Sequence, residues 1–575
     1  MDSNPNPNPK PHICQCICQC IGHILTVRRH ATVTISSSGT RQKTGEQFVN
    51  SIIDHTKDLT ELGISNGDVI AIAALNSEWY MEWFLAITSV GGIVAPLNPR
   101  WSLKEAREAV EVVKPVVLVV DECFRQWVVD LKIPSIRFNV VIGRDSFILN
   151  CSTGKDVFSI ERTSQEPMTP FNYQWAPNNV ALICFTSGTT GRPKGVAISH
   201  MALVVQAQAK ISIVKYDTND VYLHTTPLCH IGGLSSCIAV LLAGGCHVFI
   251  PRFDAKKAVK AIEHNYVTAL ITVPAILSDL IIVLRKQNRN CGDSVRKLLN
   301  GGGGLSVKLI ADASSFFPHA AIISAYGMTE AGSSLTFITL YDPLSMKCGD
   351  IFKNSSDGIM HDSDSVTHLG GSCVGKPPPH IELQIRSITC DGPSFTGRIF
   401  TRGAHVMVGY WDSSAEMMYV LNKHDWLDTR DVGWVDSSGN LWLLERVANM
   451  IKSGGENVYP NEVEAILSLH PGVSNAVVFG IPNHRLTEIV VACVYLRENW
   501  KWIYGENMNT THLKELSSET LKKHCMQKNL TRFKMPKFYI PWSKPFPYTT
   551  TGKLKRDDIR KEIMSSYLNT ILSNL

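Results

Sequence analysis

The chain has 575 residues, of which 44% are hydrophobic and 19% are charged, and its net charge is +5. One hydrophobic core rarely serves a chain of this length, so two or more domains are expected. The positive excess is too small for this length to indicate a nucleic acid partner or a membrane surface. The 16 cysteines follow no disulfide-scaffold spacing, which favours reduced thiols. No obligate protein partner is evident from the sequence.

Residues 1–30 are expected to form a flexible N-terminal segment. Its beginning is polar and rich in Pro and Asn, and no apolar core of a secretory signal follows. Four cysteines alternate with Gln and Ile, namely Cys14, Cys16, Cys18 and Cys20. Zinc sites usually space paired ligands more widely and need a second pair nearby, so half-buried packing is favoured over a metal clip.

Alternating strands and helices fill the first part of the chain. Apolar residues over 48–62 repeat at helical spacing and end at Gly63, where a helix C-cap glycine would stand. Buried strands are predicted at 69–75 and 116–120. This alternation predicts an α/β fold in which helices cover mostly parallel sheets.

The longest uncharged stretch, residues 231–250, is long enough to suggest a membrane span. Its Gly244-Gly245 pair instead favours a buried helix, a turn and a buried strand at 246–250. Further strands are predicted at 180–185 and 269–273.

The last part of the chain changes character. Residues 348–371 are rich in Ser, Asp and Gly and predict an exposed insertion. The turn sequence at 436–439 indicates a hairpin of two strands. We place the domain boundary near Arg446, which gives a large domain over 31–445 and a small α+β domain over 446–575.

The most specific chemical signal is residues 186–195, TSGTTGRPKG, directly after a predicted buried strand. Glycines permit tight turns that present N–H groups, while the hydroxyls and the lysine add donors and charge. Such a loop binds a polyphosphate, yet it is neither a Walker A loop nor a Gly-x-Ser-x-Gly elbow. The predicted nucleotide-binding residues are Thr186, Ser187, Gly188, Thr189, Thr190, Gly191 and Lys194.

These ten residues resemble the phosphate loop of the acyl-adenylate-forming enzymes, which include acyl-CoA synthetases and peptide-synthetase adenylation domains. Further motifs follow in the family's order between about residues 30 and 560. The resemblance implies ATP-dependent activation of a carboxylic acid as an acyl-adenylate, with Mg²⁺ bound, and transfer of the acyl group to coenzyme A. It also implies a large AMP-binding domain followed by a small, mobile C-terminal domain.

Residues 326–330, YGMTE, resemble the family's second motif, and the glycine run 301–304 resembles its adenine-binding turn. A carboxylate beside a hydroxyl suits a hard cation that bridges phosphates. The implied contacts are Tyr326, Gly302 and Gly303 with adenine, Thr329 with the α-phosphate, and Glu330 and Thr189 with Mg²⁺.

Three positions depart from the family's pattern around the ribose and the hinge. Asp431 matches the aspartate that binds the ribose hydroxyls, but Arg430 replaces a glycine. Arg446 matches the ribose arginine, whereas Glu445 stands where the family has glycine, and residues 447–449 lack a charged hinge residue. If position 430 requires a positive φ, an arginine there costs on the order of 1 kcal/mol.

Two segments near the C-terminus resemble the parts that serve the family's two half-reactions. Residues 452–460, KSGGENVYP, resemble the thioester loop, and residues 547–553, PYTTTGK, end in the matching adenylation lysine, Lys553. Rotation about residues 446–449 would exchange the two segments. The implied thioester-loop residues are Lys452, Gly454, Gly455 and Glu456.

Residues 228–235, LCHIGGLS, lie where the family places the wall of the acid pocket, with His230 as a gating residue. Together with residues 453–460 they look closest to the 2-succinylbenzoate–CoA ligases of the menaquinone and phylloquinone pathways. Residues 11–16 and 95–106 resemble the plant form of these ligases. A second carboxylate on the acid would need a cation or several donors. The candidate pocket residues are His230, Gly232, Gly233, Ser324 and the cation Arg252.

Two alternatives stay open. One is a ligase for a cinnamic-type or fatty acid, whose pocket would be apolar throughout. The other is a degenerate nucleotide-binding protein without turnover, which the departures at Arg430 and Glu445 favour. The retention of Lys194, Glu330 and Lys553 counts against that second alternative.

The C-terminal residues Ser573-Asn574-Leu575 resemble a variant of the Ser-Lys-Leu peroxisomal address. The family-like segment begins by residue 11, which leaves little room for a cleavable transit peptide. The peroxisome is therefore favoured over the chloroplast.

Overall fold

The structure is a computed structural model and forms two compact units. The large unit comprises residues 1–355, 377–382 and 402–427, and the small unit comprises residues 356–376, 383–401 and 428–575. The described residues are 16–101, 103–143, 147–150, 156–159, 179–187, 193–287, 292–345, 371–387, 396–411, 426–446, 451–453, 456–458, 460–483, 487–503, 514–528, 530, 532, 534–549 and 554–572.

The large unit contains an eight-stranded sheet in the order β16-β15-β14-β13-β11-β12-β1-β2. All of its pairs are parallel except those of the edge strands β2 and β16. Its strands are β1 (Thr32–Ser36), β2 (Gln42–Thr44), β11 (Val221–His224), β12 (Cys246–Phe249), β13 (Ala269–Thr272), β14 (Lys297–Asn300), β15 (Ala321–Met328) and β16 (Ser333–Tyr341).

A second sheet of the large unit has nine strands in the order β20-β10-β9-β4-β3-β5-β6-β7-β8. Its centre, from β9 to β6, is parallel. Its strands are β3 (Val69–Ala73), β4 (Ile93–Pro96), β5 (Val117–Asp121), β6 (Phe138–Ile142), β7 (Phe147–Asn150), β8 (Asp156–Ser159), β9 (Val180–Ser187), β10 (Pro193–Ser199) and β20 (Gly409–Tyr410).

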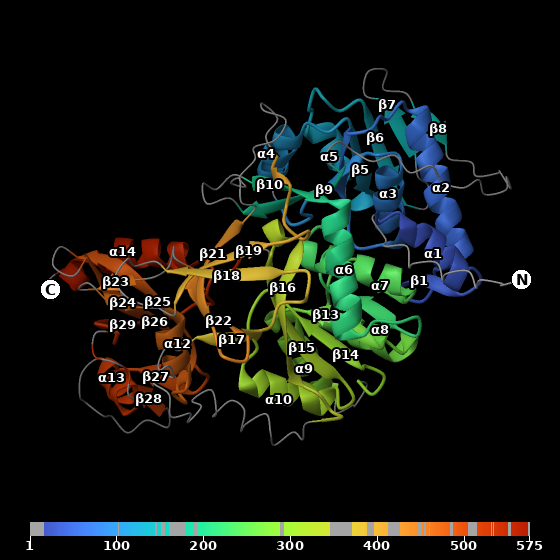
Figure 1. Ribbon diagram of the computed structural model, residues 1–575. Coiled ribbons are helices and arrows are strands. Elements are labelled where there is room, and N and C mark those ends of the chain that lie inside the picture. Colours follow the sequence, from blue (N-terminus) through green and yellow to red (C-terminus); the bar gives the residue numbers. More distant parts are fainter. Residues whose placement is uncertain are drawn as a thin grey trace, which may run out of the picture. The chain divides into compact units, whose positions relative to one another are not determined.

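Helices cover both sheets of the large unit, which confirms the predicted α/β class with mostly parallel strands (Figure 1). They are α1 (Gln19–Val27), α2 (Gly45–Glu61), α3 (Glu78–Ser89), α4 (Leu103–Val113), α5 (Arg125–Asp130), α6 (His200–Val214), α7 (Ile231–Ala243), α8 (Ala255–Asn265), α9 (Pro274–Gln287) and α10 (Val307–Phe316), with the 3₁₀ turns η1 (Glu122–Phe124) and η3 (Thr329–Ala331).

The sequence located several of these elements correctly. The helix predicted to end at Gly63 is α2, and Gly63 has the positive φ of 69° that this position needs. The uncharged stretch 231–250 is the buried helix α7 and the strand β12, joined where Gly244 has φ 76°. Among the described residues, no helix combines the length and the apolar character that crossing a membrane requires.

The N-terminal segment differs from its predicted flexibility from Cys16 onward. Helix α1 lies there, and Ile17, Ile21 and Ile24 pack into the core of the large unit. Cys16, Cys18 and Cys20 are at most 1% exposed, so the expectation of half-buried thiols was wrong. The apolar isoleucines interleaved with the cysteines explain the difference, because they bury the whole segment. Cys14 lies outside the described residues.

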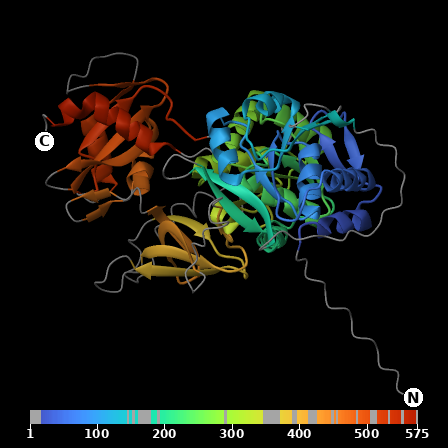
Figure 2. The ribbon, with the colours of Figure 1, turned by 90° about the horizontal axis from the view of Figure 1, so that it is seen from above.

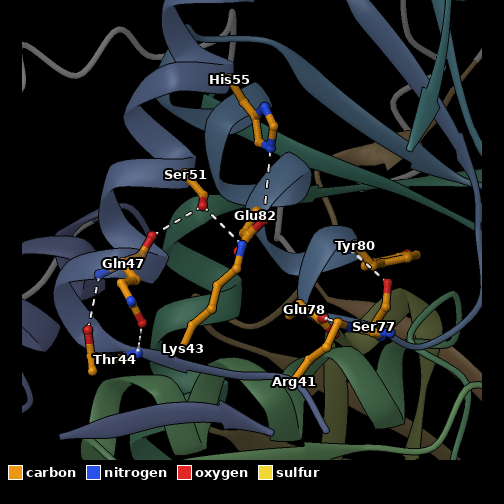
Figure 3. A network of polar contacts seen from close by, with 10 residues as sticks. All are labelled: Arg41, Lys43, Thr44, Gln47, Ser51, His55, Ser77, Glu78, Tyr80 and Glu82. Carbon is orange, nitrogen blue, oxygen red and sulfur yellow. Dashed lines mark hydrogen bonds and ion pairs between the residues drawn. The ribbon is translucent and has the colours of Figure 1, made fainter. Parts of the chain in front are cut away.

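A polar network joins β2 to the helices α2 and α3 (Figure 3). Lys43 forms an ion pair with Glu82, which is fully buried, and donates to Ser51 Oγ at 3.0 Å. Arg41 pairs with Glu78 at 2.8 Å. A buried carboxylate is tolerated only when paired, so this network fixes the position of β2 at the sheet edge.

We expect Lys43→Met to lower the free energy of unfolding by about 3 kcal/mol, because it leaves the Glu82 charge buried without its lysine. Urea unfolding measures the loss. The double variant Lys43→Met/Glu82→Leu should regain most of it. Arg29→Met is the control, because it removes only the exposed Arg29–Glu46 pair and should cost under about 1 kcal/mol. Equal losses in the two single variants would contradict the assignment.

The small unit is α+β. Its two larger sheets have the orders β17-β22-β21-β19-β18 and β24-β23-β26-β25, with β29 also pairing with β26. The strands are β17 (Ser372–Gly375), β18 (Glu382–Ser387), β19 (Gly397–Arg402), β21 (Leu427–Val435), β22 (Leu441–Arg446), β23 (Ile451–Ser453), β24 (Glu456–Val458), β25 (Val473–Asn483), β26 (Thr487–Leu496), β27 (Trp500–Trp502), β28 (Lys514–Leu516) and β29 (Phe538–Trp542), and the helices are α12 (Pro460–Ser468), α13 (Ser518–Gln527) and α14 (Arg556–Leu572).

Alternate residues of β25 and β26 face two separate apolar cores of the small unit. Helices α12 and α13 contribute to one core and α14 to the other, so helices lie against the sheet of orange strands in Figure 2. The predicted hairpin is β21–β22, with Gly439 at φ 83° in its turn, and its first strand is longer than expected. The boundary near Arg446 stays a prediction, and the insertion at 348–371 falls almost wholly outside the described residues.

Candidate active site

The predicted phosphate loop joins two strands of the nine-stranded sheet. Strand β9 is buried up to Phe185 and pairs antiparallel with β10, so that Thr186 faces Lys194 and Ser187 faces Pro193. The hairpin register therefore brings both ends of the loop together. Its tip, which carries Gly188, Thr189, Thr190 and Gly191, lies outside the described residues.

Tyr410 connects this hairpin to the second motif. The Lys194 Nζ lies 5.5 Å from the centroid of the Tyr410 ring, and the Tyr410 hydroxyl donates to Glu330 Oε1 at 2.9 Å. Strand β20 pairs with β10 beside Lys194, with Val196 opposite Tyr410. Lys194 of the predicted phosphate loop and Glu330, the predicted metal ligand, therefore both lie beside Tyr410. No local pattern in the sequence marks Tyr410, because only strand pairing brings it there.

The carboxylate of Glu330 fits a divalent cation. The residue is half-exposed in η3, and its Oε1 accepts from a neutral hydroxyl. Among the described residues no lysine, arginine or histidine forms an ion pair with it. A carboxylate beside a neutral hydroxyl is a suitable ligand for Mg²⁺ next to phosphates. Thr189, the second predicted ligand, lies outside the described residues.

The predicted adenine contacts gather at the carboxyl ends of β14 and β15. Asn300 donates from Nδ2 to Gly303 O at 2.8 Å and to Ser324 Oγ at 3.2 Å, which ties the glycine turn to β15. Gly302 has φ 72°, a conformation that favours glycine. Tyr326 is half-exposed on β15 beyond the buried part of that strand. The sequence reasoning missed Asn300, although it directly precedes the glycine run.

The predicted pocket wall runs into α7, with His230 at the N-cap. Burial, helped by the nearby charge of Arg100, lowers the pKa of His230 to about 4, so the imidazole is neutral. Asn76 holds the segment before it through Thr226 O at 3.0 Å and Leu228 N at 2.9 Å. A gating histidine without charge can leave or enter an apolar pocket at low electrostatic cost.

The two glycines after His230 have different surroundings. A Cβ at Gly233 would lie 2.6 Å from Pro227 O, so only glycine fits that close approach. A Cβ at Gly232 would meet no atom within 4 Å, so α7 borders open space there. Gly232 is therefore the position of the pair where a substrate has room.

Arg252 does not lie where the prediction needs it. Its side chain is exposed, and its charge lowers the pKa of Asp121, a carboxyl whose pKa burial raises overall. A surface arginine that acts on Asp121 is not a buried pocket cation. The prediction for Arg252 is therefore not carried further.

The predicted ribose-binding residues lie on the β21–β22 hairpin of the small unit. Asp431 and Arg446 face each other across the two strands. Arg430 has φ 61°, so the position does require the left-handed conformation that the family's glycine adopts. The peptide N–H of Arg430 donates to Asp428 Oδ1 at 2.9 Å, which holds the strained turn in place.

We expect Arg430→Gly to raise the free energy of unfolding by about 0.5–1 kcal/mol, because glycine has no Cβ to resist a positive φ. Denaturant unfolding of the two proteins measures the gain. Arg430→Ala is the matched control and should show no such gain, since alanine keeps the Cβ. A gain in the alanine variant would mean that the arginine side chain, and not the backbone, is the source.

Other predicted residues are described only in part. Lys452 and Glu456 lie in the paired strands β23 and β24, whereas Gly454 and Gly455 between them lie outside the described residues. Lys553, residues 447–449 and the C-terminal tripeptide also lie outside them. For these groups the assignments stay predictions.

Two buried groups of potential metal ligands were not predicted from the sequence. In each, the ligand atoms lie within 4.8 Å of one another: Cys16, Cys18 and His200 form one group, and His224, Cys237 and His247 form the other. Cys16 Sγ and His200 Nδ1 are 3.4 Å apart although 184 residues separate them. Spacing rules for nearby ligand pairs cannot find a histidine so far along the chain.

Family models match most of the chain. The model described as AMP-binding enzyme matches residues 27–411, and the one described as AMP-binding enzyme C-terminal domain matches residues 462–553. A protein of Arabidopsis thaliana named 2-succinylbenzoate–CoA ligase, chloroplastic/peroxisomal, is 47% identical over 95% of this chain and 97% of its own length. A 4-coumarate–CoA ligase of Vanilla planifolia is 27% identical over 89% of this chain and 87% of its own.

Solved structures share the fold. The amide bond synthetase of Marinactinospora thermotolerans superposes with a TM-score of 0.77 at 23% identity, covering 95% of this chain and 99% of that one. The o-succinylbenzoate CoA synthetase of Bacillus subtilis, solved with its acyl-adenylate intermediate, gives 0.72 at 23% identity, covering 94% and 97%. The AMP-binding enzyme model spans the loop hairpin and Glu330, and with the 47% identity to the Arabidopsis protein this shows that the chain belongs to the AMP-binding enzyme family.

Proposed function

We propose that this protein is an acid–thiol ligase that activates 2-succinylbenzoate with ATP and transfers the acyl group to coenzyme A, a reaction of phylloquinone biosynthesis. The 47% identity with the Arabidopsis ligase over nearly both chains supports the substrate. The observation that carries the reaction class is the arrangement of Lys194, Tyr410 and Glu330, which sets a cation and a carboxylate beside one phosphate-binding hairpin.

In the first half-reaction a carboxylate oxygen of the acid attacks the α-phosphorus of ATP, and the bond to pyrophosphate breaks. Lys194 and the loop N–H groups orient the phosphates, and Thr329 donates to the α-phosphate. Lys553 stabilises the charge that develops on the transferring oxygens. Tyr410 keeps Glu330 oriented throughout. No side-chain nucleophile is needed for this step.

Bound Mg²⁺ supplies charge neutralisation on the phosphate oxygens, and Glu330 with Thr189 would hold it. In the second half-reaction the thiol sulfur of coenzyme A attacks the acyl carbon, and AMP leaves with the acyl oxygen. The loop that contains Gly454 and Gly455 gives the pantetheine arm a close approach to backbone. Rotation of the small domain about residues 446–449 would separate the two half-reactions.

We place the activity in the peroxisome, with the chloroplast as the alternative. The tripeptide Ser573-Asn574-Leu575 supports the peroxisome, and the Arabidopsis relative is named for both compartments. A fluorescent protein that carries the last ten residues should enter peroxisomes. Failure of import would favour the chloroplast.

The test is release of pyrophosphate and AMP with ATP, Mg²⁺ and coenzyme A across 2-succinylbenzoate, 4-coumarate and a medium-chain fatty acid. Turnover confined to 2-succinylbenzoate supports the proposal. Turnover with another acid would support the ligase activity and contradict 2-succinylbenzoate as the substrate. Nucleotide binding without turnover of any acid would favour a degenerate binding protein.

A further inference from the structure

The large unit contains a fully buried lysine without a carboxylate partner. Lys210 on α6 is 1% exposed, and its ammonium donates to the hydroxyls of Ser235, Ser236 and Ser333. Among the described residues no Asp or Glu forms an ion pair with it. Lysine is rarely buried unless paired, so this charge needs an explanation.

The polar side chains that contact the Lys210 ammonium are hydroxyls, which can accept and donate at the same time. Ser236 donates to Gly232 O at 2.9 Å, and Ser235 donates to Ser333 Oγ at 2.9 Å. Each hydroxyl accepts from the ammonium, and among the described residues the carbonyl that accepts a hydrogen bond from the cluster is that of Gly232. A hydroxyl that accepts a hydrogen bond from a cation becomes a stronger hydrogen-bond donor. Such hydroxyls therefore favour an anion as their acceptor.

The cluster lies between two parts of the candidate site. Ser235 and Ser236 belong to the second turn of α7, at the end of the predicted pocket wall 228–235, and α6 packs along α7 (Figure 1). Ser333 opens β16 three residues after Glu330, and Gln206, one turn before Lys210, donates to Ala331 O and Ser334 O at 2.8 Å. The cation thus lies between the predicted pocket wall and the segment that follows Glu330.

Among the described residues no opposite charge lies beside this cation. Burial lowers the pKa of Lys210 to about 7, and no neighbouring carboxylate raises it again. A bound carboxylate would restore the charged form, because an opposite charge favours it. A purely structural bridge between α6 and α7 would be served as well by neutral side chains.

We propose that Lys210, with the hydroxyls of Ser235, Ser236 and Ser333, binds the second carboxylate of a dicarboxylic aromatic acid and so selects the substrate. This inference rests on the proposed ligase function and names the cation that its substrate requires. Arg252 has no part in it. The hydroxyl of Ser333 contacts the carboxylate, and Lys210 supplies the charge behind it.

The experiment compares kcat/KM for two acids in the wild type and in Lys210→Met, which keeps the volume and removes the charge. One acid is 2-succinylbenzoate, and the other is 4-oxo-4-phenylbutanoate, which has the same acyl chain and no ring carboxylate. We expect a loss of about 100-fold or more with the diacid. The monoacid should change by less than about threefold, because its pocket contacts do not need the cation.

Lys257→Met, which alters an exposed lysine of α8, is the control and should leave both acids unchanged. Equal losses for both acids in Lys210→Met would overturn the proposal, since they indicate a structural role. Unchanged use of the diacid would overturn it as well. If Lys210→Met does not fold, Ser333→Ala decides the question, with an expected diacid-specific loss of about tenfold. A wild type that uses neither acid contradicts the proposed substrate instead, which separates the two failures.

Discussion

Replacing Lys553 by alanine should reduce pyrophosphate release by about 10³-fold, while ATP binding stays within a few-fold of the wild type. The ammonium is assigned to the charge that develops when the carboxylate attacks the α-phosphorus, so its loss raises the barrier of that step alone. Stopped-flow or single-turnover measurement of pyrophosphate isolates the first half-reaction. Thioester formation from synthetic acyl-adenylate and coenzyme A should survive, because Lys553 has no role in it.

The neighbouring Lys555→Ala is the matched control for this variant. Lys555 is exposed and forms a loose pair with Asp558 at 3.9 Å, so its removal should leave both half-reactions intact. A rate of adenylation in Lys553→Ala equal to that of the wild type would contradict a role of this lysine in the mechanism. Equal losses in both half-reactions would indicate damage to the fold of the small domain.

Glu330→Gln should lower the rate of adenylation by about 10²–10³-fold, because an amide keeps the shape of the carboxylate and removes the charge that a hard cation needs. The hydrogen bond from Tyr410 can persist in this variant, so the loss reports on charge. Binding of ATP measured with and without Mg²⁺ gives a readout apart from turnover. The wild type should bind ATP more tightly with Mg²⁺, and the variant should lose that difference.

Tyr410→Phe tests the orientation of the Glu330 carboxylate without changing its charge. It removes the donor to Glu330 and keeps the carboxylate, so we expect a loss of about tenfold that extra Mg²⁺ partly restores. Glu382→Gln, at an exposed carboxylate paired with Arg402, is the control and should be silent. A Glu330→Gln enzyme with normal Mg²⁺ dependence would exclude Glu330 as a ligand.

The sequence predicted the backbone conformation correctly where that conformation depends on a few neighbouring residues. The glycines at 63, 244, 302 and 439 were read as turn or cap positions, and each has a positive φ. The strain predicted at Arg430 is present for the same reason, since a backbone conformation is a property of a few consecutive residues. Helical and strand periodicities likewise gave the α/β class, because burial of one face imposes them along the chain.

Local sequence failed where burial depends on partners far along the chain. Cys16 and Cys18 were expected to be half-buried, yet Cys16 lies against His200 and Cys18 donates to Thr88. Arg252 was a candidate for the cation that a second carboxylate needs, and the fold leaves it exposed. The hydrophobic periodicity of a sequence does not indicate which strand ends border a pocket and which lie in solvent.

The sequence by itself determined the family, the motifs and the order of the elements, because these depend on residue types at fixed spacing. Only the tertiary structure decided which side chains meet: strand pairing brings Tyr410 between Lys194 and Glu330, and helix packing buries Lys210 among three serines. Contacts of this kind depend on register and packing between distant segments, and a single sequence carries no direct record of them.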